Sequence, residues 1–190
     1  MLFIAGMRWI HLIGLGAIGG LGLYKAISGE KFRAMRFKAF LDPFAYKDTY
    51  GWQPVQSLYA LGSGGLFGLG LGKSRQKFFY IPEPYNDFIF SIIGEELGFL
   101  GSLTVIMLYL LLIWRGIKIA LNTDDLFGCL LASGITALIT IQTLIHIAVV
   151  TSSIPTTGIP LPLISYGGTS LIIYMGSIGI LLNISRHAEL

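Results

Sequence analysis

The sequence predicts an all-α, polytopic membrane protein with about four transmembrane helices and one long loop on the outer side of the membrane. Of its 190 residues, 54% are hydrophobic and only 12% are charged, whereas about a quarter of the residues in soluble proteins are charged. Several separate apolar runs approach the roughly 20 residues that cross a hydrocarbon core of about 30 Å. We therefore expect residues 1–190 to form a single membrane domain.

The four expected spans lie at residues 9–27, 88–114, 126–150 and 167–185. The first is not interpreted as a signal peptide, because no positively charged region precedes its apolar core and no clear cleavage site follows it. The few residues before it resemble the end of an earlier helix, so the sequence is expected to be part of a longer protein.

Two of the spans carry a polar face on a helical projection. Lipid would leave these groups unpaired, so we expect both faces to meet other helices or a cavity. In the second span the small and polar residues are Ser91, Gly94, Glu95, Gly98, Gly101 and Ser102. In the third span they are Ser133, Thr136, Thr140, Gln142, Thr143 and His146. A short polar connection between these spans is expected to contain Arg115, Lys118, Asp124 and Asp125.

The long outer loop is expected to cover residues 28–87. Nine of the 13 Lys and Arg residues lie between Lys25 and Lys77, a density that attracts membrane lipid headgroups and lipid phosphates. Nucleic acid is not an expected partner, because no recognised binding module accompanies the charge. Within the loop, residues 32–40 predict a short helix, either in the headgroup region or in solvent. The glycine-rich residues 57–72 predict a tightly packed re-entrant element.

The orientation follows from the short flanks of the spans. Four spans place both chain ends and the connection between the second and third spans on one side of the membrane. These flanks are basic, so the positive-inside rule makes that side cytoplasmic and places residues 28–87 outside.

Asp87 stands where the outer loop meets the second span. A carboxylate there is either a helix-start acid stabilised by the helix dipole or a base. Lys73, Arg75 and Lys77 lie upstream, and Glu83 sits between two prolines. This neighbourhood fits transfer chemistry on a lipid-linked phosphate, in which the acid takes a proton and the cations hold the phosphates.

Other polar residues within the spans predict supporting roles. Glu95 and Glu96 are adjacent and point about 100° apart, so a shared metal site is not expected. We interpret Glu95 as a packing or relay acid and Glu96 as structural. His146 is either a hydrogen-bonding histidine or a ligand, but no second His or Cys stands at zinc-ligand spacing. The single cysteine, Cys129, can form no internal disulfide.

Two stretches of the sequence, GLFGLGLGKSRQKFFYIPEPYNDFIFSIIGEELGFLG and TTGIPLPLISYGGTS, resemble the bacterial SEDS family (shape, elongation, division and sporulation). The resemblance covers about residues 1–186. The stretch LGKSRQKFFYIPEP is more similar to the FtsW and SpoVE branch than to the RodA branch. Family members have ten membrane helices, so the resemblance implies that this chain supplies the carboxy-terminal four.

The resemblance implies an inverting peptidoglycan glycosyltransferase that polymerises lipid II at the outer face of the bacterial cytoplasmic membrane. It would serve cell division, cell shape or sporulation together with a class B penicillin-binding protein. Asp87 matches the family's essential loop aspartate, the expected base for the acceptor 4-hydroxyl, and undecaprenyl pyrophosphate leaves from the growing glycan. The expected substrate-binding residues are Lys73, Arg75, Gln76, Lys77, Glu83, Pro160, Ser165 and Tyr166, and the expected supporting residues are Glu95 and His146.

Several questions stay open on the sequence. A divalent cation that helps the cationic residues to hold the pyrophosphate is left open, since the sequence does not show it, and no metal ligand is assigned. The family's amino-terminal half contributes part of the cavity, so activity of this chain alone is not established. Five residues depart from the family pattern and are expected to alter or weaken activity: Asn86, His146, Ala148, Ser152 and Ser153.

Two other functions are compatible with the same sequence. Glycine-broken segments and polar-faced helices also describe transporters, so a lipid II flippase is one alternative. The other is a non-catalytic scaffold that docks a transpeptidase.

Overall fold

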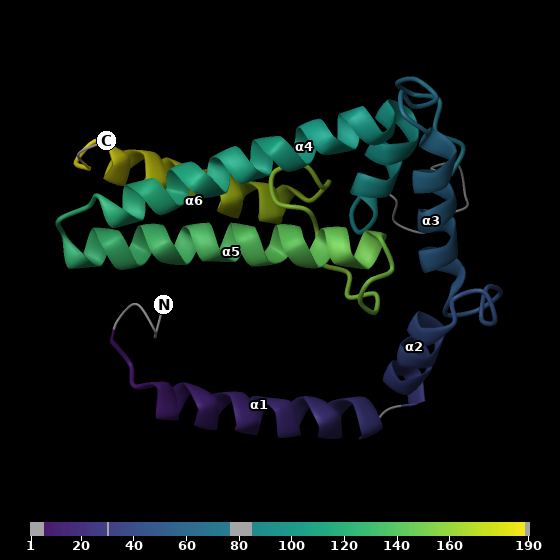
Figure 1. Cartoon of the computed structure of the whole chain (residues 1–190), viewed down its shortest axis with the longest axis horizontal. Helices are drawn as coiled ribbons and strands as arrows, with labels where there is room; N and C mark the ends of the chain where they lie inside the picture. Colours follow the sequence, from purple (N-terminus) through teal and green to yellow (C-terminus); the bar gives the residue numbers. More distant parts are fainter. Residues whose placement is uncertain (1–5, 30, 77–84, 189–190) are drawn as a thin grey trace.

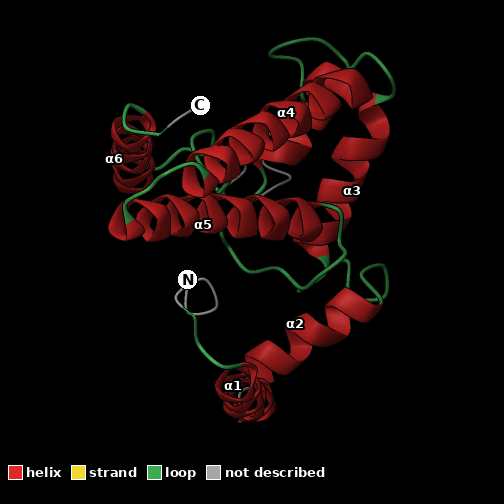
Figure 2. Cartoon of the chain, turned by 60° about the vertical axis from the view of Figure 1, so that its left-hand side comes forward, coloured by secondary structure: helices red, strands yellow, loops and turns green. Residues whose placement is uncertain are grey.

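A computed structural model of the chain describes residues 6–29, 31–76 and 85–188. Over these ranges the chain consists of helices joined by turns and loops, without a strand, as the all-α prediction requires (Figures 1 and 2). The helices are α1 (Trp9–Gly29), α2 (Lys31–Leu41), α3 (Trp52–Gly64), α4 (Ile89–Leu121), α5 (Leu126–Val150) and α6 (Gly168–Ser185).

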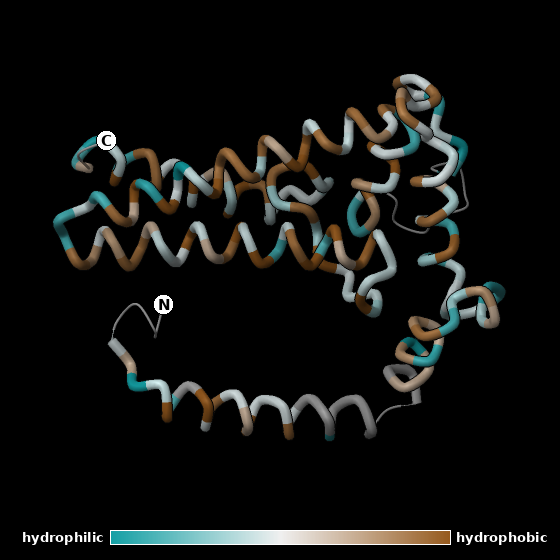
Figure 3. The backbone as a smooth tube through the Cα atoms, viewed as in Figure 1, coloured by the Kyte–Doolittle hydropathy of each residue, from teal (hydrophilic) through white to brown (hydrophobic). Residues whose placement is uncertain are grey.

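Three of these helices, α4, α5 and α6, are long and apolar enough to cross a membrane. The shortest has 18 residues and is therefore about 27 Å long. Hydrophobic residues run along all three in Figure 3, as expected for helices that face lipid. The bounds of α5 and α6 agree with the predicted spans at 126–150 and 167–185.

The first predicted span, residues 9–27, forms helix α1. This helix contacts α2 and lies apart from the three long helices in both views (Figures 1 and 2). The apolar helical stretch described there, Trp9–Gly22, is shorter than the roughly 20 residues that a span needs. A fourth span therefore stays a prediction.

The second span is longer than predicted, because α4 continues to Leu121 instead of ending near Trp114. Arg115 and Lys118, which were expected in a polar connection, lie in the last turns of the helix. Their charged groups lie 6.0 and 5.9 Å from the centre of the Trp114 ring. Long cationic side chains reach polar surroundings while the backbone stays helical, and positive charge near a helix C-terminus is favourable.

The described part of the predicted outer loop contains helices α2 and α3. The helix predicted over residues 32–40 is confirmed as α2. The glycine-rich element predicted over residues 57–72 is divided, because its first part belongs to α3 and its second part is an irregular loop.

Helix α4 is broken at Gly98, whose φ of 69° and ψ of −164° are not helical. The projection that treated residues 88–114 as one continuous helix is therefore wrong at this point. We call residues 89–97, which precede the break, the short arm of α4. The small and polar face predicted for the second span nevertheless lies against protein on both sides of the break, since Ser91 and Glu95 before it and Ser102 after it are buried.

The loop that follows α3 completes the hydrogen bonds that this break interrupts. In a continuous helix, the carbonyl groups before the break would accept hydrogen bonds from the N–H groups after it. Here both sets bind residues 65–70 instead, through Leu69 N–H to Glu95 O (3.0 Å), Gly70 N–H to Glu96 O (2.9 Å), Phe99 N–H to Gly65 O (2.9 Å) and Leu100 N–H to Leu66 O (3.2 Å). The predicted tight packing of the glycine-rich segment is confirmed, with α4 as its partner.

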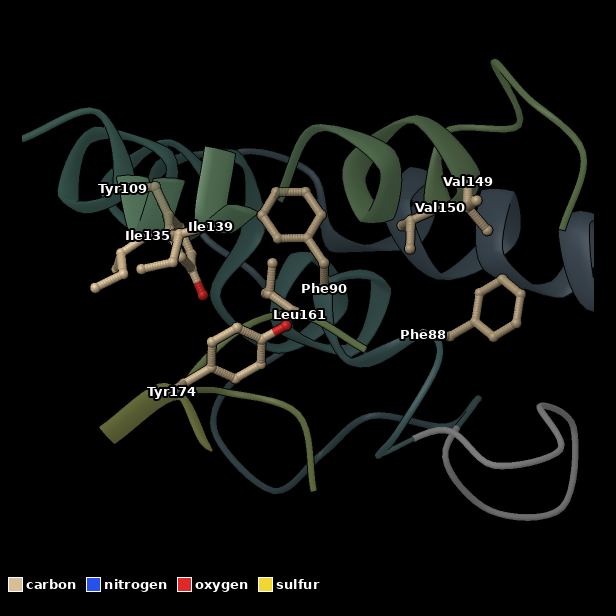
Figure 4. Close-up of a cluster of buried hydrophobic side chains, with 9 residues drawn as sticks. All are labelled: Phe88, Phe90, Tyr109, Ile135, Ile139, Val149, Val150, Leu161 and Tyr174. Atoms are coloured by element: carbon tan, nitrogen blue, oxygen red, sulfur yellow. The ribbon is translucent and has the colours of Figure 1, made fainter. Parts of the chain in front are cut away.

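One hydrophobic cluster joins the start of α4 to α5, α6 and the loop at residues 151–167. Its buried members are Phe88, Phe90, Tyr109, Ile135, Ile139, Val149, Val150, Leu161 and Tyr174 (Figure 4). Phe88 is only 1% exposed and directly follows Asp87 in the chain. The core therefore fixes the backbone at the position of the predicted base.

The polar face predicted on the third span also points into protein. Thr136, Thr143 and His146 are buried, and the other three predicted members, Ser133, Thr140 and Gln142, are half-buried. Ser57 of α3 donates a hydrogen bond of 2.7 Å to the carbonyl oxygen of Val150, the last residue of α5. This bond pairs a carbonyl group that the helix end leaves without an intrahelical partner.

Candidate functional site

Asp87 lies immediately before α4, where the chain enters the membrane bundle. Its side chain is half-buried and faces Gly158 in the loop between α5 and α6. A Cβ atom on Gly158 would lie 3.4 Å from the Asp87 Oδ2 atom. Phe88, and not Asp87, occupies the N-cap position of α4. The geometry therefore directs the carboxylate towards the loop at residues 151–167 and favours a role beyond capping.

Two hydrogen bonds hold this loop against the residues that precede Asp87, and a third lies within the loop. The Tyr166 N–H donates to the Tyr85 carbonyl oxygen at 2.9 Å. The Ser165 hydroxyl donates to the Asn86 carbonyl oxygen at 2.6 Å and accepts from the Leu161 N–H at 2.8 Å. Two predicted substrate-binding residues, Ser165 and Tyr166, are thus brought to the segment that carries Asp87.

A groove opens beside this junction. It has a volume of about 480 Å³ and is lined by Tyr85, Ile89, Ser165, Tyr166 and Leu171 among others. The Tyr166 side chain is 78% exposed, so its ring is available to a ligand. Pro160, also predicted to bind substrate, is half-buried in the same loop. The groove combines apolar and aromatic surface with a few polar groups, which is typical of ligand sites, and Asp87 lies in the segment between two of its lining residues, Tyr85 and Ile89.

The second group of predicted residues lies on the loop at residues 72–76, which two glutamates of α4 hold in place. Glu95 is 1% exposed and accepts hydrogen bonds from the Ser74 hydroxyl (2.5 Å), the Arg75 N–H (2.9 Å) and the Gln76 N–H (3.3 Å). Glu96 accepts from the N–H groups of Gly72 (2.9 Å) and Ser74 (3.2 Å). These bonds support the interpretation of Glu95 as a packing acid and of Glu96 as structural. We call this arrangement the glutamate clamp.

The glutamate clamp leaves the cations of its loop outside the protein interior. Lys73 and Arg75 are exposed, and Gln76 is half-buried. Arg75 and Gln76, together with Tyr59 and Glu95, line a second groove of about 500 Å³. Positive charge beside a groove suits an anionic group such as a phosphate.

The structure divides the predicted site into two parts. Asp87 precedes the short arm of α4, whereas the clamp lies near the arm's other end. Eight residues separate Asp87 from Glu95, which corresponds to about 12 Å along a helix. Two further predicted substrate-binding residues, Lys77 and Glu83, lie outside the described residues.

His146, on helix α5, supports the loop at residues 151–167. It is fully buried near the end of α5, and its Nδ1 atom lies 2.9 Å from the carbonyl oxygen of Ile159. Over the described ranges, no group of three or more His, Cys, Asp or Glu residues could hold a metal ion. A cation at the pyrophosphate stays a prediction, since substrate phosphates would supply most of its ligands.

Sequence reasoning missed three residues that shape the site. Ser74 binds Glu95, Gly158 borders Asp87, and Arg36 of α2 donates from Nη1 to the Thr156 carbonyl oxygen at 3.3 Å. Only Gly158 carried a local signal, since a glycine in a proline-rich turn often takes a positive φ, here 73°. The other two contacts join residues too far apart in the sequence for any local pattern to reveal them.

A family model described as a cell cycle protein, which groups FtsW, RodA and SpoVE, matches residues 1–190. The chain belongs to this family. It is 50% identical to the stage V sporulation protein E of Bacillus subtilis strain 168 over 189 residues, which are 100% of this chain and 52% of that protein. It is 46% identical to a probable peptidoglycan glycosyltransferase FtsW of Trichlorobacter lovleyi, covering 100% of this chain and 50% of that protein. The chain thus spans about half the length of the curated relatives it matches.

Two solved structures share the fold of this FtsW/RodA/SpoVE family member. A chain solved in work on the "Structural coordination of polymerization and crosslinking by a peptidoglycan synthase complex" matches with a TM-score of 0.74 and 28% identity, over 99% of this chain and 52% of that one. An aspartate-to-alanine mutant of the Thermus thermophilus rod shape determining protein RodA matches with a TM-score of 0.54 and 33% identity, over 70% of this chain and 40% of that one. Family membership and the three apolar helices identify a multi-pass protein of the cytoplasmic membrane.

Proposed function

We propose that this chain belongs to an inverting peptidoglycan glycosyltransferase that polymerises lipid II at the outer face of the cytoplasmic membrane. The names of its relatives support this class of reaction. The observation that carries the proposal is the position of Asp87, a half-buried carboxylate that borders the loop at residues 151–167 next to a groove. Such a carboxylate can accept a proton from a bound hydroxyl group.

Asp87 acts as the base in the proposed reaction. It takes the proton from the acceptor sugar's 4-hydroxyl while that oxygen forms a bond to the anomeric carbon of the lipid-linked donor. The bond from this carbon to the pyrophosphate oxygen breaks, and undecaprenyl pyrophosphate leaves with the bonding electrons. A single displacement inverts the anomeric configuration, so one base suffices and no covalent intermediate on the protein is required.

The clamped loop is proposed to hold the departing pyrophosphate. Lys73 and Arg75 are exposed on a loop whose backbone the glutamate clamp holds. Their long side chains can extend along the short arm towards the sugar bound at Asp87. Fixed positive charge at the point where negative charge develops stabilises the transition state more than the ground state.

The proposed partners follow from the same reaction. Lipid II and the undecaprenyl-pyrophosphate-linked glycan chain are the substrates, and surrounding membrane lipids contact the apolar helices. A class B penicillin-binding protein is the proposed transpeptidase partner. One structural neighbour comes from a peptidoglycan synthase complex that coordinates polymerization with crosslinking, which supports a partner of this type.

The break in α4 is the feature that a transporter would share. In transporters, broken helices direct their free backbone groups at the transported ion or substrate. Here the carbonyl groups before the break and the N–H groups after it are paired with the loop at residues 65–70. This internal pairing favours a structural role for the break and supports the glycosyltransferase over a lipid II flippase.

The test compares the full-length protein with its Asp87→Asn variant, each purified with the transpeptidase partner and supplied with labelled lipid II. We expect polymerisation by Asp87→Asn to fall by a factor on the order of 10² to 10⁴, because the amide cannot take the proton. Asp124→Asn, an exposed acid in the turn between α4 and α5, is the matched control and should polymerise normally.

Three outcomes would contradict parts of the proposal. Normal polymerisation by Asp87→Asn removes the base assignment. Lipid II transfer across vesicle membranes without polymer formation by the wild-type protein supports a flippase. Absence of both activities, with transpeptidase binding retained, supports a scaffold.

A further inference from the structure

His146 is an unusual residue for the interior of a membrane helix. It is 0% exposed, and its Nδ1 atom lies 2.9 Å from the Ile159 carbonyl oxygen. A carbonyl oxygen only accepts hydrogen bonds, so Nδ1 carries the proton and Nε2 presents a lone pair. Within the part of the chain that the structure describes, Nε2 is buried without a hydrogen-bond partner. An apolar side chain would avoid this unpaired acceptor, so packing alone does not favour a histidine here.

The carbonyl group that His146 binds lies next to the residue that borders Asp87. Gly158 precedes Ile159 and has a φ of 73°. A Cβ atom on Gly158 would lie 3.4 Å from Oδ2 and 3.9 Å from Cγ of Asp87, so the carboxylate lies close to this turn, with room for no more than a methyl group between them. The path from the imidazole to the carboxylate therefore consists of one hydrogen bond to Ile159, the peptide unit that joins Ile159 to Gly158, and the short gap between Gly158 and Asp87.

Other hydrogen bonds hold the same loop at other positions. Arg36 binds the Thr156 carbonyl oxygen, and Ser165 joins Leu161 to Asn86. None of these hydrogen bonds involves Gly158 or Ile159. A change at His146 would therefore free the turn at Gly158 while most of the loop stays attached.

We propose that His146 is a positioning residue for Asp87. Its Nδ1–H bond to Ile159 fixes the Gly158 turn, and the turn sets the direction of the Asp87 carboxylate. This inference rests on the proposed function, in which Asp87 is the base. His146 contacts neither substrate nor the transferred proton, and its effect passes entirely through the loop.

The geometry of the hydrogen bond distinguishes three substitutions. In histidine and in asparagine, the donor nitrogen is attached directly to Cγ, so His146→Asn can retain the bond to Ile159. In glutamine the amide nitrogen is one bond farther from the backbone, so His146→Gln places its donor near the former Nε2 position. His146→Leu fills the site without any donor. Thr143→Val changes another buried polar residue one turn earlier on α5 and is the matched control.

The experiment measures lipid II polymerisation by the full-length protein with its transpeptidase partner, and the thermal unfolding of each variant. We expect His146→Asn to keep kcat within about threefold of wild type. His146→Gln and His146→Leu should lower kcat by at least about tenfold with the KM for lipid II unchanged, because misplacing a reacting group by about 1 Å can slow a reaction 10²-fold. Thr143→Val should polymerise normally.

Two results would overturn the inference. One is a kcat for His146→Gln equal to that of His146→Asn. The other is a loss of activity that, in every variant, is fully explained by a smaller fraction of folded protein. Asp87→Asn, assayed in parallel, separates this inference from the proposed function. If Asp87→Asn is inactive and His146→Gln is fully active, only the role of His146 fails, whereas an active Asp87→Asn removes the proposed base itself.

Discussion

Gly98 shows how one residue allows α4 and the loop after α3 to interlock. Its φ of 69° is a conformation that residues with a Cβ atom rarely adopt. A Cβ atom there would also collide with the Gly68 nitrogen and lie 2.7 Å from the Leu66 carbonyl oxygen. Both neighbours are backbone atoms, which cannot turn away as a flexible side chain can. The absence of a side chain at Gly98 is therefore a structural requirement.

We predict that Gly98→Ala destabilises the full-length protein by at least about 2 kcal/mol, since backbone strain and overpacking each contribute about 1–3 kcal/mol. Thermal or denaturant unfolding in detergent measures this change. The control is Gly62→Ala, at an exposed position of α3 where a Cβ atom would meet nothing within 4 Å. It should be neutral or stabilising by up to about 1 kcal/mol. Equal stability of the two variants would be inconsistent with the packing described.

Gly158 is the second residue whose backbone conformation matters for the site. We predict that Gly158→Ala lowers lipid II polymerisation by about tenfold or more, because the positive φ of 73° is strained for alanine and the turn would move against Asp87. Initial rates of polymer formation check this expectation. Gly179→Ala, in α6 away from this groove and with nothing within 4 Å of an added Cβ atom, is the control. A rate for Gly158→Ala equal to that of the control would contradict a role of the Gly158 turn in placing Asp87.

At the scale of elements, the glutamate clamp joins the short arm of α4 to the loop that carries Lys73 and Arg75. A carboxylate offers only acceptors, and Glu95 faces one hydroxyl and two backbone N–H donors. Hydrogen bonds to a charged group contribute about 1.5–3 kcal/mol each. The loop therefore keeps a defined shape although it is glycine-rich and its cations are exposed.

We predict that Glu95→Gln opens this loop. The NH₂ group of the glutamine amide would face a hydroxyl or N–H group that now donates to a carboxylate oxygen, so at least one of these hydrogen bonds would be lost. Trypsin cleavage of the full-length protein after Lys73 and Arg75, both exposed, should become about tenfold faster or more. Asp124→Asn removes one exposed carboxylate elsewhere and serves as the control. Unchanged cleavage rates at both sites in Glu95→Gln would show that the clamp does not stabilise the loop.

At the scale of the whole molecule, the functional segments gather at one end of the bundle formed by α4, α5 and α6. The loops around residues 65–76, 85–88 and 151–167 lie there, whereas the turn between α4 and α5 and the end of α6 lie at the opposite end (Figure 1). The basic side chains near the opposite end, Arg115, Lys118 and Arg186, predict that it faces the cytoplasm.

Cysteine labelling tests this orientation. Labelling uses a background in which Cys129 and any other cysteine of the full-length protein are replaced by serine. We predict that Thr157→Cys in the loop after α5 reacts with a membrane-impermeant maleimide in intact cells, whereas Asp124→Cys reacts only after the membrane is permeabilised. Both positions are exposed in the structure. The reverse labelling pattern would place the proposed site in the cytoplasm and remove access to lipid II at the outer face.

Predictions from sequence succeeded where the relevant property is local. The bounds of α5 and the helix α2 follow from hydrophobic length and periodicity within one segment. The end of α4 was wrong because Arg115 and Lys118 were interpreted as loop residues, although long cationic side chains are compatible with a helix end. The break at Gly98 was missed because a lone glycine in an apolar helix is usually tolerated.

The candidate site was predictable in part. Asp87 was identified from its position between a basic loop and an apolar helix, and Ser165 and Tyr166 lie close to its segment as expected. The separation of Asp87 from the clamped loop could not be predicted, since it depends on how the short arm packs. The hydrogen bond from Ser74 to Glu95 could not be predicted either, because the two residues lie 21 positions apart in the sequence.

The sequence by itself determined that this chain crosses a membrane and where most of its long apolar helices run, whereas the preference for Asp87 as the base came from the family resemblance. Those properties depend on hydrophobic length, helical period and residue chemistry, which each segment carries alone. Only the tertiary structure decided that α4 breaks at Gly98, that two glutamates clamp the cationic loop, and that His146 reaches the turn beside Asp87. These features depend on which distant backbone groups pair when the helices pack, and buried groups must find such partners wherever the fold supplies them.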